Sequence, residues 1–181
     1  VEQFMQDYYA HATRTEHLSS TLIVKSFKDK DSSTGLLGYL GRRSLGSDFF
    51  SYRGELKTAR KNLFTSRPEA MMQAFLLAKQ NNLALSSDVK SQLRDNLSLV
   101  NDGFRRNREI SEMFLEILRG PTGVAQSLRD MHHNNNSNRH NPLIKRIYCQ
   151  VQHDAYHVYT VDIHSIFAVE EIEKLWSGVY K

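Results

Sequence analysis

The chain has little of what cross-linked or membrane-spanning proteins need. Its single cysteine, Cys149, cannot form an internal disulfide, so we expect a fold that forms in a reducing compartment, most simply the cytoplasm. The longest aliphatic runs, TLIV and AFLLA, are far shorter than the roughly 20 residues of a transmembrane helix. The N-terminus also lacks the basic-then-apolar pattern of a signal peptide. We therefore expect neither insertion into a membrane nor targeting to one.

The chain also has little net charge. Its 24 basic and 20 acidic residues leave a surplus of +4, which over 181 residues does not indicate a nucleic-acid-binding protein. A cluster of Arg105, Arg106 and Arg108 could contact phosphate, but an exposed polar face is the interpretation we favour. Binding of nucleic acid through this cluster would require a strongly salt-dependent affinity. Val1 opens directly into a helical pattern without an initiator methionine, so we expect a piece of a longer chain.

What the sequence does contain is a series of amphipathic helical patterns. Apolar residues from Val1 to Ile23 recur at helical spacing and predict one long N-terminal helix. Residues 28–46 are polar and glycine-containing, which is typical of a surface connection. The stretch GLLGYLGRR within it lacks the Gly-Lys-Ser/Thr ending of a phosphate-binding loop.

Four further helices are predicted from caps and apolar stripes. Ser66 opens a capping-box pattern, and Met71 and Met72 are expected to fill the core beneath that helix. The next helix is expected to start at Ser87 and to run as far as Val100. Another is expected to start at Asn107 and to end at Gly120-Pro121, and a fourth to start at Val124. The turn-like Arg53-Gly54 predicts a short hairpin. These patterns indicate an all-α fold, an antiparallel helical bundle that allows one small β-hairpin near residues 48–57.

The stretch CQVQHDAYHVYTVDIHS holds three histidines, His153, His157 and His164. On one straight helix they would share a face, but about 16 Å would separate the first from the last, too far for one ion. Thr160 is better placed as the N-cap of a new helix that has Asp162 in its first turn. For His153 and His157 we favour capping or packing, with support of metal ligands through hydrogen bonds as the alternative.

The stretches QHDAYHVYTVDIHS and DGFRRNREISEMFLEILRGPTGVAQSLRDMH resemble the bifunctional PII uridylyltransferase/uridylyl-removing enzyme family. The resemblance implies a nucleotidyltransferase domain, a helical region, an HD-type metal phosphohydrolase domain and two ACT domains, of which this chain covers the middle. It is good over residues 67–131 and 146–172 and loose over 1–50. The stretch NNNSNRHNPLI departs from the family pattern and keeps only Pro142. The division that the resemblance implies is a helical region at 1–131, a polar linker at 132–145 and the start of a truncated HD domain at 146–181.

The resemblance implies one site residue, His164, as the first metal ligand of the HD domain. The pair His153-Asp154 precedes His164, and the family's His-Asp pair is expected beyond Lys181. We assign no catalytic and no cofactor-binding residue here. A divalent metal (Mg, Mn or Zn) is implied for the full-length parent and none for this piece alone. With one ligand in place, we expect this piece to be inactive by itself although the parent is an enzyme.

The function expected from the resemblance is a connecting scaffold, without catalysis of its own, in an enzyme that modifies and demodifies the PII nitrogen-signalling protein. The alternative is a helical regulatory or protein-interaction domain of another HD-type or nucleotidyltransferase signalling protein. In either case truncation would expose the apolar face of residues 164–176, so self-association through the C-terminal helix is expected. The transferred nucleotide, the effectors and the roles of His153, Asp154 and His157 stay open.

Overall fold

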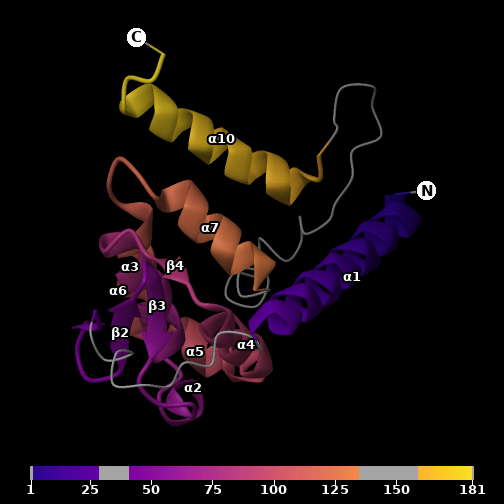
Figure 1. Cartoon of the computed structure of the whole chain (residues 1–181). Coiled ribbons are helices and arrows are strands. Elements are labelled where there is room, and N and C mark those ends of the chain that lie inside the picture. Colours follow the sequence, from indigo (N-terminus) through magenta and orange to yellow (C-terminus); the bar gives the residue numbers. More distant parts are fainter. Residues whose placement is uncertain (1, 29–40, 135–158, 181) are drawn as a thin grey trace.

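The structure is a computed structural model that describes residues 2–28, 41–134 and 159–180 (Figure 1). The described chain is mostly helical and includes a small four-stranded sheet. The prediction of an all-α fold with one small hairpin is therefore right for most of these residues, and it misses the two outer strands of the sheet. The elements are α1 (Glu2–Lys28), β1 (Arg43–Ser44), β2 (Phe49–Tyr52), β3 (Glu55–Thr58), α2 (Leu63–Ser66), α3 (Ala70–Gln80), β4 (Ala84–Leu85), α4 (Ser87–Asp95), the 3₁₀-helix η2 (Leu97–Leu99), α5 (Asp102–Arg106), α6 (Arg108–Leu118), α7 (Val124–His133) and α10 (Val161–Trp176).

The predicted hairpin is confirmed and forms the centre of the sheet. Strands β2 and β3 pair antiparallel, with Phe49 opposite Thr58. Arg53 and Gly54 join them, with φ angles of 52° and 77°. Two positive φ angles in a two-residue loop match the right-handed twist of the flanking strands. The hairpin that the sequence indicated is therefore set by its turn.

The two outer strands were not predicted. β1 pairs antiparallel with β2, and β4 pairs parallel with β3, which places Leu56 opposite Leu85. A parallel pair needs a crossover connection, and α3 lies in that connection. Each outer strand is two residues long, which is too short to show an alternating pattern in the sequence.

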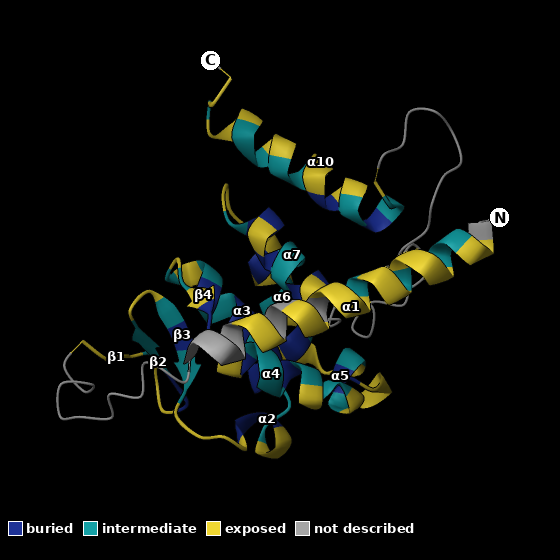
Figure 2. Ribbon diagram, turned by 45° about the vertical axis from the view of Figure 1, so that its right-hand side comes forward, coloured by how far each residue is buried: buried dark blue, intermediate teal, exposed yellow. Residues whose placement is uncertain are grey.

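The core lies between the sheet and the helices that follow it (Figure 2). Met71 and Met72 on α3 have exposed fractions of 0% and 1%, so the prediction that they fill the core is confirmed. Leu56 of β3 and Ile117 of α6 are also fully buried and belong to the same cluster. The largest buried side chains in it are Phe49, Phe64, Phe75, Leu56, Leu63, Met71, Met72, Leu93, Ile110, Ile117 and Val89.

Two of the predicted helix starts are wrong in detail. Ser66 does not cap α3, because it is the last residue of α2 and its hydroxyl donates to the carbonyl oxygens of Asn62 and Leu63 at 3.1 and 3.0 Å. The N-cap of α4 is Ser86, one residue before the predicted Ser87, and it accepts a hydrogen bond from the amide of Val89 at 3.4 Å. The N-cap residue of α3 is Glu69, whose side chain makes no capping hydrogen bond.

The helix predicted to run from Ser87 to Val100 is shorter. α4 ends at Asp95, and the apolar spacing continues through η2 before Asn101 caps the separate helix α5. Asn107 caps α6 as predicted and accepts from the amides of Glu109 and Ile110 at 2.9 and 3.4 Å. The spacing of apolar residues continued beyond the end of α4, so it led to an overestimate of the length of that helix.

The remaining sequence features are consistent with the structure where it describes them. The long N-terminal helix is α1, and the greater part of the predicted 28–46 connection lies outside the described residues. Arg105 pairs with Asp102 and Arg108 pairs with Glu112 at the surface, as on an exposed polar face. Within the described segments, no helix has the length and apolar character needed to cross a membrane.

Candidate functional site

The candidate site is the contact between α7 and α10, which lie alongside each other in Figures 1 and 2. It is called here the α7–α10 junction. Polar side chains from both helices meet in it, at both ends and in the middle. The residues that define the junction are Val124, Ala125, Arg129, His132, Asp162, Ile166, Glu170 and Glu173.

At one end of the junction, His132 and Asp162 form a buried pair. His132 lies in the last turn of α7 and Asp162 in the first turn of α10, with exposed fractions of 5% and 3%. The imidazole Nε2 and the carboxylate Oδ2 are 2.7 Å apart. Because an ionised carboxylate only accepts hydrogen bonds, the imidazole N–H donates in this contact. The pair links residues that are 30 positions apart in the sequence.

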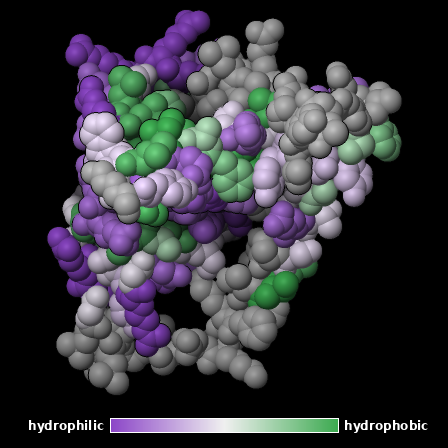
Figure 3. All heavy atoms as spheres, turned by 90° about the horizontal axis from the view of Figure 1, so that it is seen from above, coloured by the Kyte–Doolittle hydropathy of each residue, from purple (hydrophilic) through white to green (hydrophobic). Residues whose placement is uncertain are grey.

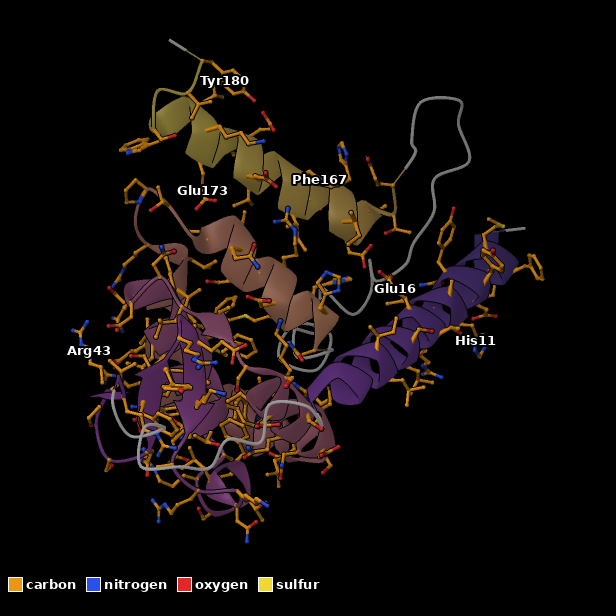
Figure 4. The ribbon with its side chains drawn as sticks, viewed as in Figure 1. His11, Glu16, Arg43, Phe167, Glu173 and Tyr180 are labelled. Atoms are coloured by element: carbon orange, nitrogen blue, oxygen red, sulfur yellow. The ribbon has the colours of Figure 1, made fainter. Side chains whose placement is uncertain are left out.

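At the other end, Glu173 of α10 caps the start of α7. The N-cap residue of α7 is Gly123, which has a φ of 81° and no side chain to accept from the first amides of the helix. The Glu173 carboxylate accepts instead from the amide of Val124 at 2.6 Å and from that of Ala125 at 3.2 Å. Its negative charge also suits the positive end of the helix dipole. Figure 4 shows Glu173 directed from α10 toward α7.

In the middle of the junction, Arg129 of α7 pairs with Glu170 of α10. Their side chains have exposed fractions of 30% and 29%, so this pair is far more open to solvent than His132–Asp162. The hydrogen bond from Arg129, followed by one from Lys174, holds the pKa of Glu170 below its ordinary value. The guanidinium also lies 5.7 Å from the ring centroid of Phe167.

Lys79 of α3 supports the junction from the core side. Its ammonium group donates to the carbonyl oxygen of Ile117 at 2.6 Å and to that of Arg119, at the end of α6. Burial lowers its pKa, although Glu173 and then Glu116 act in the opposite direction. A Cβ atom added to Gly123 would lie 3.3 Å from the Lys79 Cγ. The side chain of one lysine therefore packs where α6 ends and α7 begins.

The predicted metal ligand, His164, lies in the first turn of α10 and is exposed. Its amide donates to the carbonyl oxygen of Thr160 at 2.9 Å, and Thr160 is the N-cap residue as predicted, although its side chain makes no capping hydrogen bond. Positions 162 and 164 are about 200° apart around a helix, so His164 lies on the side of α10 away from the residue that contacts α7. His153 and His157, with Asp154, lie outside the described residues.

The described residues do not provide a complete metal site around His164. Across residues 2–28, 41–134 and 159–180, no three His, Cys, Asp or Glu side chains are grouped so that they could hold an ion. His164 would have to share an ion with ligands from elsewhere, and its role as a ligand stays a prediction.

The exposed surface of α10 includes large apolar side chains. These include Ile172 at 62%, Leu175 at 64% and Trp176 at 78%. Figure 3, which views the molecule from above, shows hydrophobic atoms gathered on this surface. The exposed surface of α10 thus carries large apolar residues together with Glu171 and His164.

The sequence did not predict the junction. His132 falls at the first position of the predicted 132–145 linker, but in the structure it lies in α7, which continues to His133. The predicted division into domains itself stays a prediction. One local signal was present in the sequence. The N-cap residue of α7 is Gly123 and not Ser, Thr, Asp or Asn, so the first amides of the helix require an acceptor from elsewhere. Asp162 was predicted only to suit the dipole of its own helix.

Comparisons with known proteins place these elements in context. The family model described as "Uridylyltransferase GlnD third domain" matches residues 49–136, from β2 to just past the end of α7. The "Bifunctional uridylyltransferase/uridylyl-removing enzyme" of Pseudomonas savastanoi pv. phaseolicola is 30% identical to this chain over 181 residues. The protein of the same name from Ectopseudomonas mendocina is 30% identical over 176 residues. The first alignment covers 97% of this chain and the second 96%, and each covers 19% of the relative. The chain thus spans about a fifth of these relatives. No solved structure matches.

Proposed function

Residues 49–136 belong to the family of uridylyltransferase GlnD third domains, and from this premise we propose that the chain is a connecting scaffold of a bifunctional uridylyltransferase/uridylyl-removing enzyme. The parent enzyme would modify and demodify the PII nitrogen-signalling protein in the cytoplasm. The scaffold would contribute position rather than reacting groups. It would hold α10, the expected first helix of the HD domain, on the third domain.

The observation that carries this proposal is the α7–α10 junction. The family match ends at residue 136 and α10 begins at Val161, so the junction joins the matched domain to the segment that follows it. The buried His132–Asp162 pair and the Glu173 cap give α10 a defined position against α7. Such contacts support a structural joint between two domains better than a flexible tether.

In the full-length parent, His164 would be one ligand of a divalent Mg, Mn or Zn ion. Imidazole is the commonest protein ligand of such metals. The other ligands would come from polypeptide that follows this segment. The scaffold proposal therefore predicts that the present chain binds metal weakly or not at all through His164.

Calorimetric titration of the chain with Mn²⁺ and Zn²⁺ tests this prediction. The matched control is His164→Ala, because the chain has seven other histidines and the variant isolates binding through His164. We expect weak or flat titrations that are the same for the wild type and the variant. Tight binding of one ion per chain that is lost in His164→Ala would show a complete site and contradict the scaffold proposal.

The enzymatic part of the proposal requires the full-length protein. A full-length enzyme that contains this segment should both attach UMP to PII and remove it, and His164→Ala should reduce removal while it leaves attachment unchanged. A full-length protein with neither activity toward PII would refute the assignment.

The exposed apolar residues near the end of α10 favour a second function, that of a protein-interaction domain. Ile172, Leu175 and Trp176 are each more than 60% exposed, which is unusual for neighbouring large apolar residues. Two copies of the chain could bury these residues against each other. Sedimentation equilibrium should then show dimers that Leu175→Asp abolishes, and a monomer at high concentration would argue against self-association.

A further inference from the structure

We propose that His132 is a positioning residue, which acts through Asp162 to fix where α10 lies on the third domain. The consequence of this role for catalysis rests on the proposed function.

The contacts along α10 define its register against α7. Asp162 and Glu173 are 11 positions apart, or about 16 Å along a helix, and they lie within about 20° of the same face. Asp162 contacts the last turn of α7 and Glu173 contacts its first turn. A shift of α10 by one turn, about 5.4 Å, would break both contacts.

Apolar packing does little to hold this register. Among the described residues of α10, Ile166 is the one buried apolar side chain, with an exposed fraction of 9%. Phe167 lies beside Arg129 of α7, and Ile172, Leu175 and Trp176 are each more than 60% exposed. The hydrogen-bonded polar contacts are therefore the directional contacts that can select one position of α10.

The polar contacts differ in how much each can contribute. Arg129–Glu170 is about 30% exposed on both sides, and solvent-exposed ion pairs of this kind contribute little to stability. His132 and Asp162 are both almost fully buried, and loss of one partner would leave the other in a site with little access to water. A buried pair of this kind tolerates only a narrow range of geometries, so His132 is the residue that selects one position.

The pair also orients the residue two positions further along. When Asp162 faces His132, His164 faces away from α7, about 200° around the helix. Without the pair, α10 could rotate or detach, and His164 would lose its fixed direction. The imidazole of His132 thus controls the placement of a second imidazole that it does not touch.

Hydrogen exchange measured by mass spectrometry on the whole chain tests the inference. In His132→Ala, we expect the amides of α10 to exchange about tenfold faster or more, which corresponds to about 1.4 kcal/mol. The amides of α3 in the core should stay within about twofold of wild type. Asp162→Ala should have the same effect, and the double variant should be no worse than either single variant, because the pair acts as a unit.

Two conservative variants of His132 separate positioning from simple filling of space. His132→Gln places an amide nitrogen close to where the imidazole Nε2 lies and should restore the protection of α10. His132→Asn is too short to reach the Asp162 carboxylate and should behave like His132→Ala. These two variants differ by one methylene, so they are matched in chemistry and differ in reach.

Several results would overturn the inference. It fails if α10 keeps its protection in His132→Ala, if α3 and α10 accelerate equally, if the two single variants add in the double variant, or if His132→Gln does not rescue. If His132→Ala does not fold, the comparison of His132→Gln with His132→Asn decides instead.

In the full-length enzyme, His132→Ala should reduce removal of UMP from PII, and His132→Gln should restore it, with attachment of UMP unchanged in both. This arm separates the two proposals. A wild-type enzyme that removes no UMP would refute the proposed function, while the exchange result for His132 would still stand. If the wild-type enzyme and His132→Ala remove UMP equally well, the positioning role is refuted.

Discussion

Removal of the Glu173 carboxylate should loosen the start of α7, although the two are far apart in the sequence. Glu173 accepts from the amides of Val124 and Ala125, 49 and 48 positions away, and the N-cap residue Gly123 has no side chain that could replace it. In Glu173→Ala both amides lose their acceptor and the negative charge leaves the helix terminus. In Glu173→Gln one acceptor oxygen remains, while the charge and the second acceptor oxygen are lost.

The structure allows the size of each effect to be worked out. Loss of an N-cap acceptor costs about 0.5–2 kcal/mol, and a charge at a helix terminus contributes about 0.3–1 kcal/mol. We therefore expect Glu173→Ala to lower the free energy of unfolding by about 1–2 kcal/mol and Glu173→Gln by about 0.5–1 kcal/mol. For a chain of this size, 1 kcal/mol corresponds to a fall in Tm of roughly 2–4 °C.

Urea denaturation at neutral pH measures these differences, with Glu171→Ala as the matched control. Glu171 lies on the same helix and is exposed, and its partners Lys174 and Tyr180 are surface residues nearby in the sequence. Its replacement changes helix propensity by the same amount and should stay within about 0.5 kcal/mol of wild type. If Glu173→Ala costs no more than Glu171→Ala, the cap does not stabilise the fold and the reasoning is wrong.

Three further predictions concern Asp48, Gly123 and Met71. Asp48 is buried and accepts from Arg60 at 2.6 Å, and this hydrogen bond is the first cause of its lowered pKa. Asp48→Asn should lower the free energy of unfolding by about 2 kcal/mol in urea denaturation near pH 7. The difference in unfolding free energy between wild type and variant should shrink as the pH falls below 3.8, the ordinary pKa of aspartate, because the wild-type carboxylate takes up a proton. A difference that does not change with pH would refute this assignment. Gly123→Ala should lower the free energy of unfolding by about 1–2 kcal/mol, because its φ is 81° and the new Cβ would approach Lys79, and an unchanged Tm would contradict it. Met71→Ala should cost about 2–5 kcal/mol by the same measurement, since the side chain is fully buried and would leave a cavity; a cost near zero would show that the core closes around it.

The sequence predicted the elements whose causes are local. α6 has a capping Asn107 at one end and Gly120 with a φ of 101° beyond the other, and both signals lie within a few residues of the helix. The hairpin follows from Arg53-Gly54 in the same way. Where two local signals competed, the prediction failed: Ser66 could begin one helix or end another, and in the structure it ends α2.

The sequence could not predict contacts between distant residues. The strand β4 exists because Leu85 pairs with Leu56 across the α3 crossover, and nothing in the dipeptide itself indicates a strand. His132 and Asp162 are each ordinary polar residues in their own helices, and their burial depends on how α7 meets α10. The site was therefore missed because its parts lie on two elements whose pairing has no local signature.

The spacing of these contacts along the chain has a consequence for the order of folding. The β2–β3 hairpin closes within residues 49–58, whereas the junction closes when residues 30 to 49 positions apart meet. Closure of longer loops costs more entropy and slows the formation of distant contacts. The hairpin should therefore form early, and α10, which is synthesised after the sheet and α7, should dock later onto them.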